Sequence, residues 1–167
     1  MAKLYHILIF SFLFLNIGCG VYSFSGGSIP PEVKSISIDY FKNTASIVVP
    51  SLSQEFTDQL RNRFVSETNL VLVDGQGDWH FEGNITQYNI SPVAPSGNET
   101  ASLSRLTVKI KVVFTDNLDE NNKWVSSFNS YENFDASLDL SSVEDDLLEV
   151  IIAELVDKIY NKSVVNW

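Results

Sequence analysis

The segment LTVKIKVVF, residues 106–114, places a large apolar side chain at every second position. Successive side chains of a strand point to opposite faces, so this pattern predicts a strand with one buried face. A loop rich in Asp and Asn follows at 116–122, and a second strand is expected around 124–134. The two segments are therefore predicted to form a hairpin.

Upstream of this hairpin, three more segments have strand character. The first is 33–41, the second is the short apolar run 70–73, and the third begins at Trp79 and ends before Pro92. In the third segment the apolar residues shift phase between Ile85 and Tyr88. Such a shift predicts a β-bulge near Gln87.

Two segments have helical periodicity. Apolar residues recur every four positions over 52–66, after a Ser51-x-x-Gln54 capping box. A second capping box is predicted at Ser141-x-x-Glu144, and a broad apolar stripe follows it over 147–159. The order of elements predicts an α+β fold, with two helices packed on one face of a mostly antiparallel sheet of about four strands.

The N-terminus predicts export. Residues 1–18 carry Lys3 and then a run, Leu4 to Ile17, in which His6 is the one side chain that can carry a charge near neutral pH. This run is shorter than the roughly 20 residues that a helix needs to cross a bilayer, and it is typical of a secretory signal. The alternative is a buried N-terminal helix, but such a helix would have no polar side to face water.

The apolar run ends in Leu15-Asn16-Ile17-Gly18-Cys19, which resembles the lipobox of bacterial lipoproteins. Gly18 gives access to the scissile bond, and the Cys19 thiol would accept the lipid, although the family prefers Leu where this chain has Asn16. We therefore expect a signal peptide at 1–18, a lipidated tether at 19–31 and a single α+β domain at 32–167. Two or three acyl chains on Cys19 would anchor the chain stably to a membrane.

Composition limits the partners and the chemistry. The 167-residue chain has a net charge of −10, which disfavours nucleic acid. His80 is the only histidine after Cys19, and no second Cys or His is available for a metal set, so neither a metal nor a cofactor is expected. The carboxylates at 116–120 and 145–146 fit a solvated loop and a helix first turn. The sequence does not predict an enzyme.

The arrangement of these segments resembles the LptE family of lipopolysaccharide-assembly lipoproteins. The resemblance rests on CGVYSFSGGSIPPEVKSISIDYF (19–41), a helix, GDWHFEGNITQYNISPV (77–93), two strands and an amphipathic C-terminal helix. Its most specific parts are the CGVYSF start at 19–24, the IPPEVKSISI entry into the first strand at 29–38, and the F-x-G-x-I-x-x-Y pattern from Phe81 to Tyr88. The resemblance implies a non-enzymatic protein that sits inside an LptD-like outer-membrane β-barrel, helps it assemble, and contacts lipopolysaccharide.

The expected location is the outer membrane, with the domain on the periplasmic side or within the barrel lumen. Gly20 follows the cysteine, and no acidic residue occurs before Glu32, so the retention signals found in other bacterial lipoproteins are missing. The alternative function is a lipid-anchored auxiliary subunit of a periplasmic transport or secretion complex. Co-purification with a large barrel protein would distinguish the two.

Basic side chains mark one candidate ligand site. Arg105, Lys109 and Lys111 fall on the polar face of the 106–114 strand, and Lys123 on the next strand is a weaker fourth candidate. These cations could contact the phosphates of lipopolysaccharide. The alternative is an ordinary solvated face, paired with acidic neighbours such as Glu132.

The three tryptophans are expected to play different parts. Trp79 and Trp124 occupy alternating strand positions and are predicted to belong to the core. Trp167, at the C-terminal end, is expected to be exposed or bound to a partner.

Overall fold

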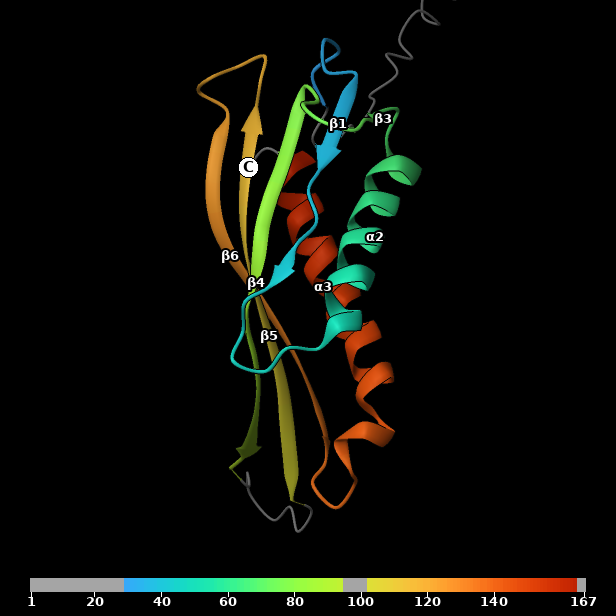
Figure 1. The fold of residues 1–167 in the computed structure, drawn as a ribbon, viewed down its shortest axis with the longest axis vertical. Coiled ribbons are helices and arrows are strands. Elements are labelled where there is room, and N and C mark those ends of the chain that lie inside the picture. The colour runs from blue at the N-terminus through green and yellow to red at the C-terminus, as the bar shows by residue number, and fades with distance from the viewer. Residues whose placement is uncertain (1–28, 95–101, 165–167) are drawn as a thin grey trace, which may run out of the picture.

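The computed structural model describes residues 29–94 and 102–164 (Figure 1). The predicted signal peptide, Cys19, most of the tether and Trp167 lie outside these ranges. The described elements, in chain order, are β1 (Ser35–Ile38), β2 (Lys42–Asn43), α2 (Pro50–Glu67), β3 (Val71–Leu72), β4 (Trp79–Val93), β5 (Leu103–Asp116), β6 (Lys123–Asp135), the 3₁₀ turn η2 (Leu140–Ser142) and α3 (Glu144–Val164).

The two helices cover one face of a six-stranded sheet, so the predicted α+β class is confirmed (Figure 1). The strand order is β3-β1-β4-β5-β6, and β2 pairs with β4 beyond the end of β1. The long strands β4, β5 and β6 are antiparallel, whereas β1 and β2 run parallel to β4. The sheet is thus mixed rather than purely antiparallel. It has six strands instead of about four, and two of them, β2 and β3, are each two residues long.

The strand that contains residues 106–114, β5, lies between β4 and the edge strand β6. The five alternating apolar side chains from Leu106 to Phe114 are at most 1% exposed and face the helices, and the side chains between them face outward. The predicted hairpin is confirmed, with Thr115 opposite Lys123 at the turn and Leu103 opposite Asp135 at the far end. The predicted bulge is also confirmed, since the register of β4 against β5 shifts between Ile85 and Gln87.

Both helices were predicted, but neither capping box forms. Helix α2 starts at Pro50, and the preceding Val49 provides no side-chain cap. Proline has no N–H, so the first helical position leaves no backbone donor to be capped. Helix α3 starts at Glu144, while Ser141 lies within the preceding 3₁₀ turn. No helix in the described parts of the chain is long and apolar enough to span a membrane.

Aromatic rings fill the core between sheet and helices. Phe81 of β4 contacts Phe114 of β5 and Phe64 of α2, with ring centroids 4.9 and 5.0 Å apart. Trp79 is 2% exposed, which confirms its predicted core position, and its Nε1–H donates to Asp116 Oδ2 at 3.0 Å. Trp124 packs against the core as a half-buried side chain.

Candidate functional site

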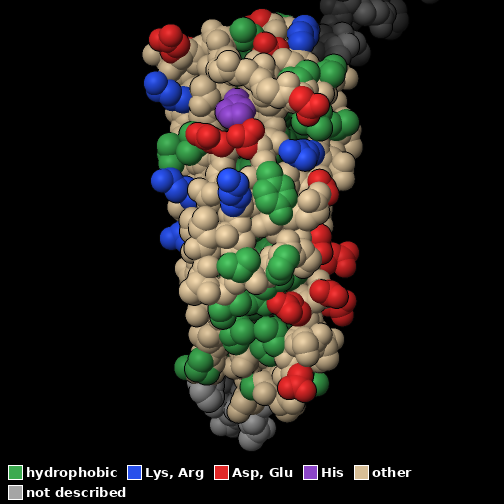
Figure 2. Space-filling model, viewed as in Figure 1, with side chains coloured by type: hydrophobic (Ala, Val, Ile, Leu, Met, Phe, Trp, Pro, Cys, Tyr) green, Lys and Arg blue, Asp and Glu red, His purple; other side chains and the backbone are tan. Residues whose placement is uncertain are grey.

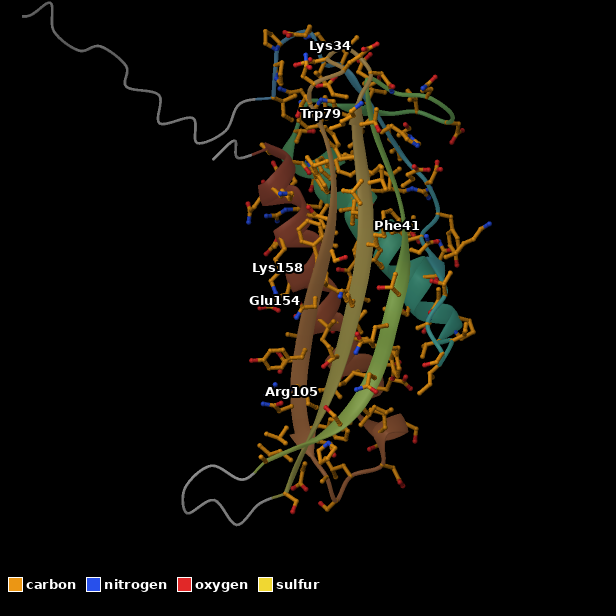
Figure 3. The ribbon with its side chains drawn as sticks, turned by 90° about the vertical axis from the view of Figure 1, so that its left-hand side faces the viewer. Lys34, Phe41, Trp79, Arg105, Glu154 and Lys158 are labelled. Carbon is orange, nitrogen blue, oxygen red and sulfur yellow. The ribbon has the colours of Figure 1, made fainter. Side chains whose placement is uncertain are left out.

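The face of the sheet opposite the helices is open and mostly polar. Along β5 the side chains of Arg105, Thr107, Lys109 and Lys111 all point to it, because Leu106, Val108 and Ile110 between them are buried on the helix side. Helices cover only the other face (Figure 3). The structure therefore brings the three predicted basic residues into one row, as their spacing indicates.

The neighbours of these cations across the sheet are uncharged. Arg105 stands between Ser91 of β4 and Asn133 of β6, and Lys109 stands between Gln87 and Asn129. Directly opposite side chains in an antiparallel pair share a face and lie about 5 Å apart.

Lys111 has the same kind of surroundings, between Asn84 of β4 and Ser127 of β6. Among the described residues, none of Arg105, Lys109 and Lys111 forms an ion pair. Their charges are therefore available to an external anion.

Glu132 cannot neutralise the row in the way that the solvated-face alternative suggested. It lies opposite Leu106 in the β5–β6 ladder, and Leu106 is buried on the helix side. Glu132 and Arg105 consequently belong to opposite faces of the sheet. The solvated-face alternative therefore lacks Glu132, the acidic partner that it named.

Arg105 is held in place by β6. Its Nε–H donates to Asn133 Oδ1 at 2.9 Å, and its guanidinium carbon lies 3.9 Å from the centre of the Tyr131 ring. Stacking on an aromatic face fixes the guanidinium plane and leaves its other N–H groups free to donate. Figure 3 shows Arg105 toward the end of the sheet away from Trp79.

Two further lysines share the open face. Lys123 stands opposite Thr115 at the hairpin turn, as the sequence suggested. Lys42 of β2 pairs with Asn84, which in turn pairs with Lys111, so Lys42 extends the basic row across β4. The sequence did not indicate that Lys42 belongs to this face, because β2 has only two residues and shows no alternating pattern.

A shallow hollow of about 330 Å³ opens on this face at the Lys42–Lys111 end. Asp39, Glu82 and Gly83 form its other side. The hollow is therefore lined by both signs of charge: the carboxylates of Asp39 and Glu82, and the cations of Lys42 on β2 and Lys111 on β5.

Polar contacts join helix α3 to the sheet at its N-terminal end and near its middle. The Tyr88 hydroxyl donates to Glu144, and burial followed by the nearby carboxylate raises the pKa of Tyr88. Near the middle of the helix, Ser130 donates to Glu154, and Lys158 Nζ reaches Asn129 O at 3.0 Å. The Ser130 and Lys158 hydrogen bonds lower the pKa of Glu154. These contacts stabilise the domain and leave the open face unobstructed.

Fold and face together define the class: a small α+β domain with helices on one side of its sheet and an uncovered polar face on the other. The chain belongs to the LptE family, described as lipopolysaccharide-assembly, whose model matches residues 33–163. The predicted resemblance is confirmed over nearly the whole domain. No curated protein sequence matches the chain.

Solved structures share the fold at low sequence identity. A minor lipoprotein from Acinetobacter baumannii superposes with a TM-score of 0.53 at 12% identity, covering 78% of this chain and 93% of its own. The uncharacterized lipoprotein B from Nitrosomonas europaea gives a TM-score of 0.51 at 12% identity, with coverages of 81% and 83%. A hypothetical protein from Chlamydia trachomatis gives 0.52 at 10% identity, with coverages of 80% and 99%. These likenesses concern the fold alone.

Proposed function

We propose that this chain is a non-enzymatic outer-membrane lipoprotein that seats in an LptD-type β-barrel, assists its assembly, and binds lipopolysaccharide on its way to the outer leaflet. Membership of the LptE family supports the assembly role. In this proposal, Cys19 carries the lipid that tethers the domain to the membrane. The barrel and the location follow from the family resemblance.

The observation that carries the ligand part is the row of basic side chains on the open face. Arg105, Lys109 and Lys111 have uncharged neighbours across the sheet, although the whole chain has a net charge of −10. Lipopolysaccharide presents phosphates on its lipid and inner sugars, and charge-assisted hydrogen bonds suit lysine and arginine. The Tyr131 ring beside Arg105 is 46% exposed and offers an apolar contact in the same row.

A charge-reversal pair tests this role. Lys109→Glu with Lys111→Glu should weaken binding of rough-type lipopolysaccharide about tenfold, because each exposed charge contact contributes up to about 1 kcal/mol and its reversal adds repulsion. The matched control is Lys34→Glu with Lys162→Glu, two exposed lysines outside the row, which changes the net charge equally and should leave binding near the wild-type value. Binding is measured by titration of the labelled lipid at low and high salt.

Two outcomes separate the parts of the proposal. Equal weakening by both pairs would show that net charge, rather than the open face, controls binding. Dephosphorylated lipopolysaccharide should bind all variants alike, and a difference that persists with this lipid would contradict phosphate recognition.

The barrel partner is tested separately by affinity purification from outer membranes. A large barrel protein should co-purify in stoichiometric amount. Recovery of inner-membrane or periplasmic transport proteins instead would favour the auxiliary-subunit function.

A further inference from the structure

Three metal-ligating side chains meet on the open face where β1 ends beside β4. His80 and Glu82 are two residues apart on β4 and share a face, and Asp39 directly follows β1. The donor atoms of Asp39, His80 and Glu82 all lie within 4.8 Å of one another. Figure 2 shows a histidine side chain, in purple, next to red carboxylates on the surface of the molecule.

The backbone places these three residues firmly. Strands β1 and β4 pair in parallel with Ser37 opposite His80, and Asp39 N–H donates to Phe81 O at 2.9 Å. The ladder thus continues one residue past β1 and brings Asp39 alongside Glu82. A site built on paired strands holds its ligands more precisely than a site on a loop.

The Ser37 hydroxyl orients the His80 imidazole through a hydrogen bond to Nδ1. Its Oγ lies 2.8 Å from His80 Nδ1, accepts the Gly77 N–H at 3.0 Å, and lies 3.4 Å from Trp79 O. A hydroxyl has one proton and two lone pairs, and a carbonyl can only accept. All three contacts are satisfied when the hydroxyl donates to Trp79 O and accepts from both Gly77 N–H and His80 Nδ1–H.

This hydrogen-bond assignment leaves a lone pair on His80 Nε2. That atom faces Asp39 Oδ2 at 3.9 Å, and Glu82 is the third member of the cluster. An unprotonated Nε2 and two carboxylates are all acceptors, so their mutual approach calls for a positive charge among them, which either a bound metal ion or a proton on Nε2 supplies. Ser37 is 2% exposed, which gives the histidine the buried second-layer partner that metal-bound histidines usually have.

We propose that Asp39, His80 and Glu82 bind one Zn²⁺ ion. Zinc takes imidazole nitrogen and carboxylate oxygen at about 2.0–2.2 Å, which sets tetrahedral ligand atoms about 3.4 Å apart. The 3.9 Å separation of Nε2 and Oδ2 closes to that value by a small rotation of the Asp39 side chain, which is 59% exposed. Calcium and magnesium prefer all-oxygen sites and fit this set less well.

The site has access and an open coordination position. Asp39 and Glu82 line the hollow that also contains Lys42 and Lys111, so an ion can enter from solvent. Three protein ligands leave the fourth tetrahedral position to water or to an external donor. The ion would also neutralise the two carboxylates. The sequence did not predict this site because only Cys and His were counted as possible ligands there. The fold brings two carboxylates, Asp39 and Glu82, to the histidine.

The test uses the full chain purified from membranes in detergent, with a tag that contains no histidine. After the protein is stripped with EDTA, calorimetric titration with Zn²⁺ should show one ion per chain, and excess Mg²⁺ or Ca²⁺ should not compete. His80→Gln should weaken Zn²⁺ binding about 100-fold, and Ser37→Ala about tenfold through loss of the orienting partner. His6 is the only other histidine in the chain, so the His80 variant isolates the site.

Matched variants and a second readout keep the result decisive. Glu82→Gln should weaken binding, whereas Glu55→Gln, an exposed residue of α2, should not. Co²⁺ should give the visible absorption of a tetrahedral nitrogen and oxygen site in the wild type and not in His80→Gln. Zinc should raise the melting temperature of the wild type and of Glu55→Gln but not that of His80→Gln, and a cooperative melting transition shows that each variant is folded. Absence of one-to-one binding by the wild type, or equal affinity of His80→Gln, would overturn the proposal.

Discussion

At the scale of single residues, Asp78 joins the start of β1 to the start of β4. Its Oδ2 accepts the backbone N–H groups of Lys34 and Ser35, each at 2.9 Å, and its own N–H donates to Ser35 Oγ at 2.9 Å. The hydrogen bond from Lys34, followed by those from Ser35, lowers the pKa of Asp78 below its ordinary value of 3.8. These bonds set where the parallel pairing begins, and the metal-ligand cluster depends on that register.

Asp78 should make the domain less stable in acid. Because the pKa is lower in the folded state than in the unfolded state, the stabilisation is complete above about pH 4–5. It is lost as the pH falls through the folded-state value. In urea unfolding, the wild-type midpoint should therefore decline below pH 4, and the decline should be smaller in Asp78→Asn.

Asp74→Asn provides the control in the same turn. Among the described residues, its side chain accepts no hydrogen bond, so this variant should decline with pH as the wild type does. An Asp78→Asn curve parallel to the wild-type curve would contradict the prediction.

At the scale of elements, the F-x-G-x-I-x-x-Y pattern of β4 has a packing explanation. Phe81, Ile85 and Tyr88 are buried on the helix side. Gly83 shares that side, where an added Cβ would come within 2.5 Å of the Phe41 ring and would also meet Lys111 O. Glycine therefore makes room for Phe41. The two residues between Ile85 and Tyr88 mark the bulge, which holds one residue more than β5 has opposite it.

The bulge predicts an asymmetric response to single deletions. Ile85 pairs with Ile110 and Gln87 pairs with Lys109, so removal of Thr86 should restore regular alternation and keep Tyr88 inside. Removal of Thr107 from the regular strand β5 should instead turn Leu106 from the core to the open face. We expect the Thr86 deletion to fold with a modestly lower melting temperature.

The Thr107 deletion should lose far more stability, since exposing a buried leucine and leaving its cavity costs about 2–5 kcal/mol. Circular dichroism melting compares the two proteins. The prediction fails if the Thr86 deletion is the less stable of the two.

At the scale of the whole molecule, the helix side of the sheet and its open face carry different kinds of residue. The helices and the inner side chains of the sheet make up the core, and the open face carries the basic row and the metal-ligand cluster. Residue 29, the first that the structure describes, lies beside the start of β1, in a hollow that Leu70, Tyr160 and Val164 also line. The expected lipid tether precedes this point in the chain.

Cys19 is predicted to determine where the whole molecule resides. Cys19→Ala should remove the acyl acceptor and move the chain from the membrane fraction to the soluble periplasmic fraction, because two or three acyl chains account for stable anchoring. Fractionation with immunoblotting measures the shift. Asn16→Leu, which restores the preferred lipobox residue, should keep the chain in the membrane, and membrane retention of Cys19→Ala would contradict lipid anchoring.

Local patterns by themselves determined most of the elements. Alternation predicted the strands and the bulge, and helical spacing of apolar residues predicted both helices, because these periods follow from backbone geometry within each segment. The same alternation correctly put Arg105, Lys109 and Lys111 on one face. Capping boxes were the exception, since a matching spacing does not fix where the backbone turns into a helix.

Only the tertiary structure decided which segments became neighbours. Asp39 and His80 are 41 residues apart, and the parallel pairing of β1 with β4 that joins them is not encoded in either segment's period. Parallel pairing with β4 also added β2 and Lys42 to the sheet. The β5–β6 register placed Glu132 on the helix side, away from the basic row. Periodicity assigns a side chain to a face, whereas the long-range strand order decides what lies beside it, and that order is set by the packing of the whole core.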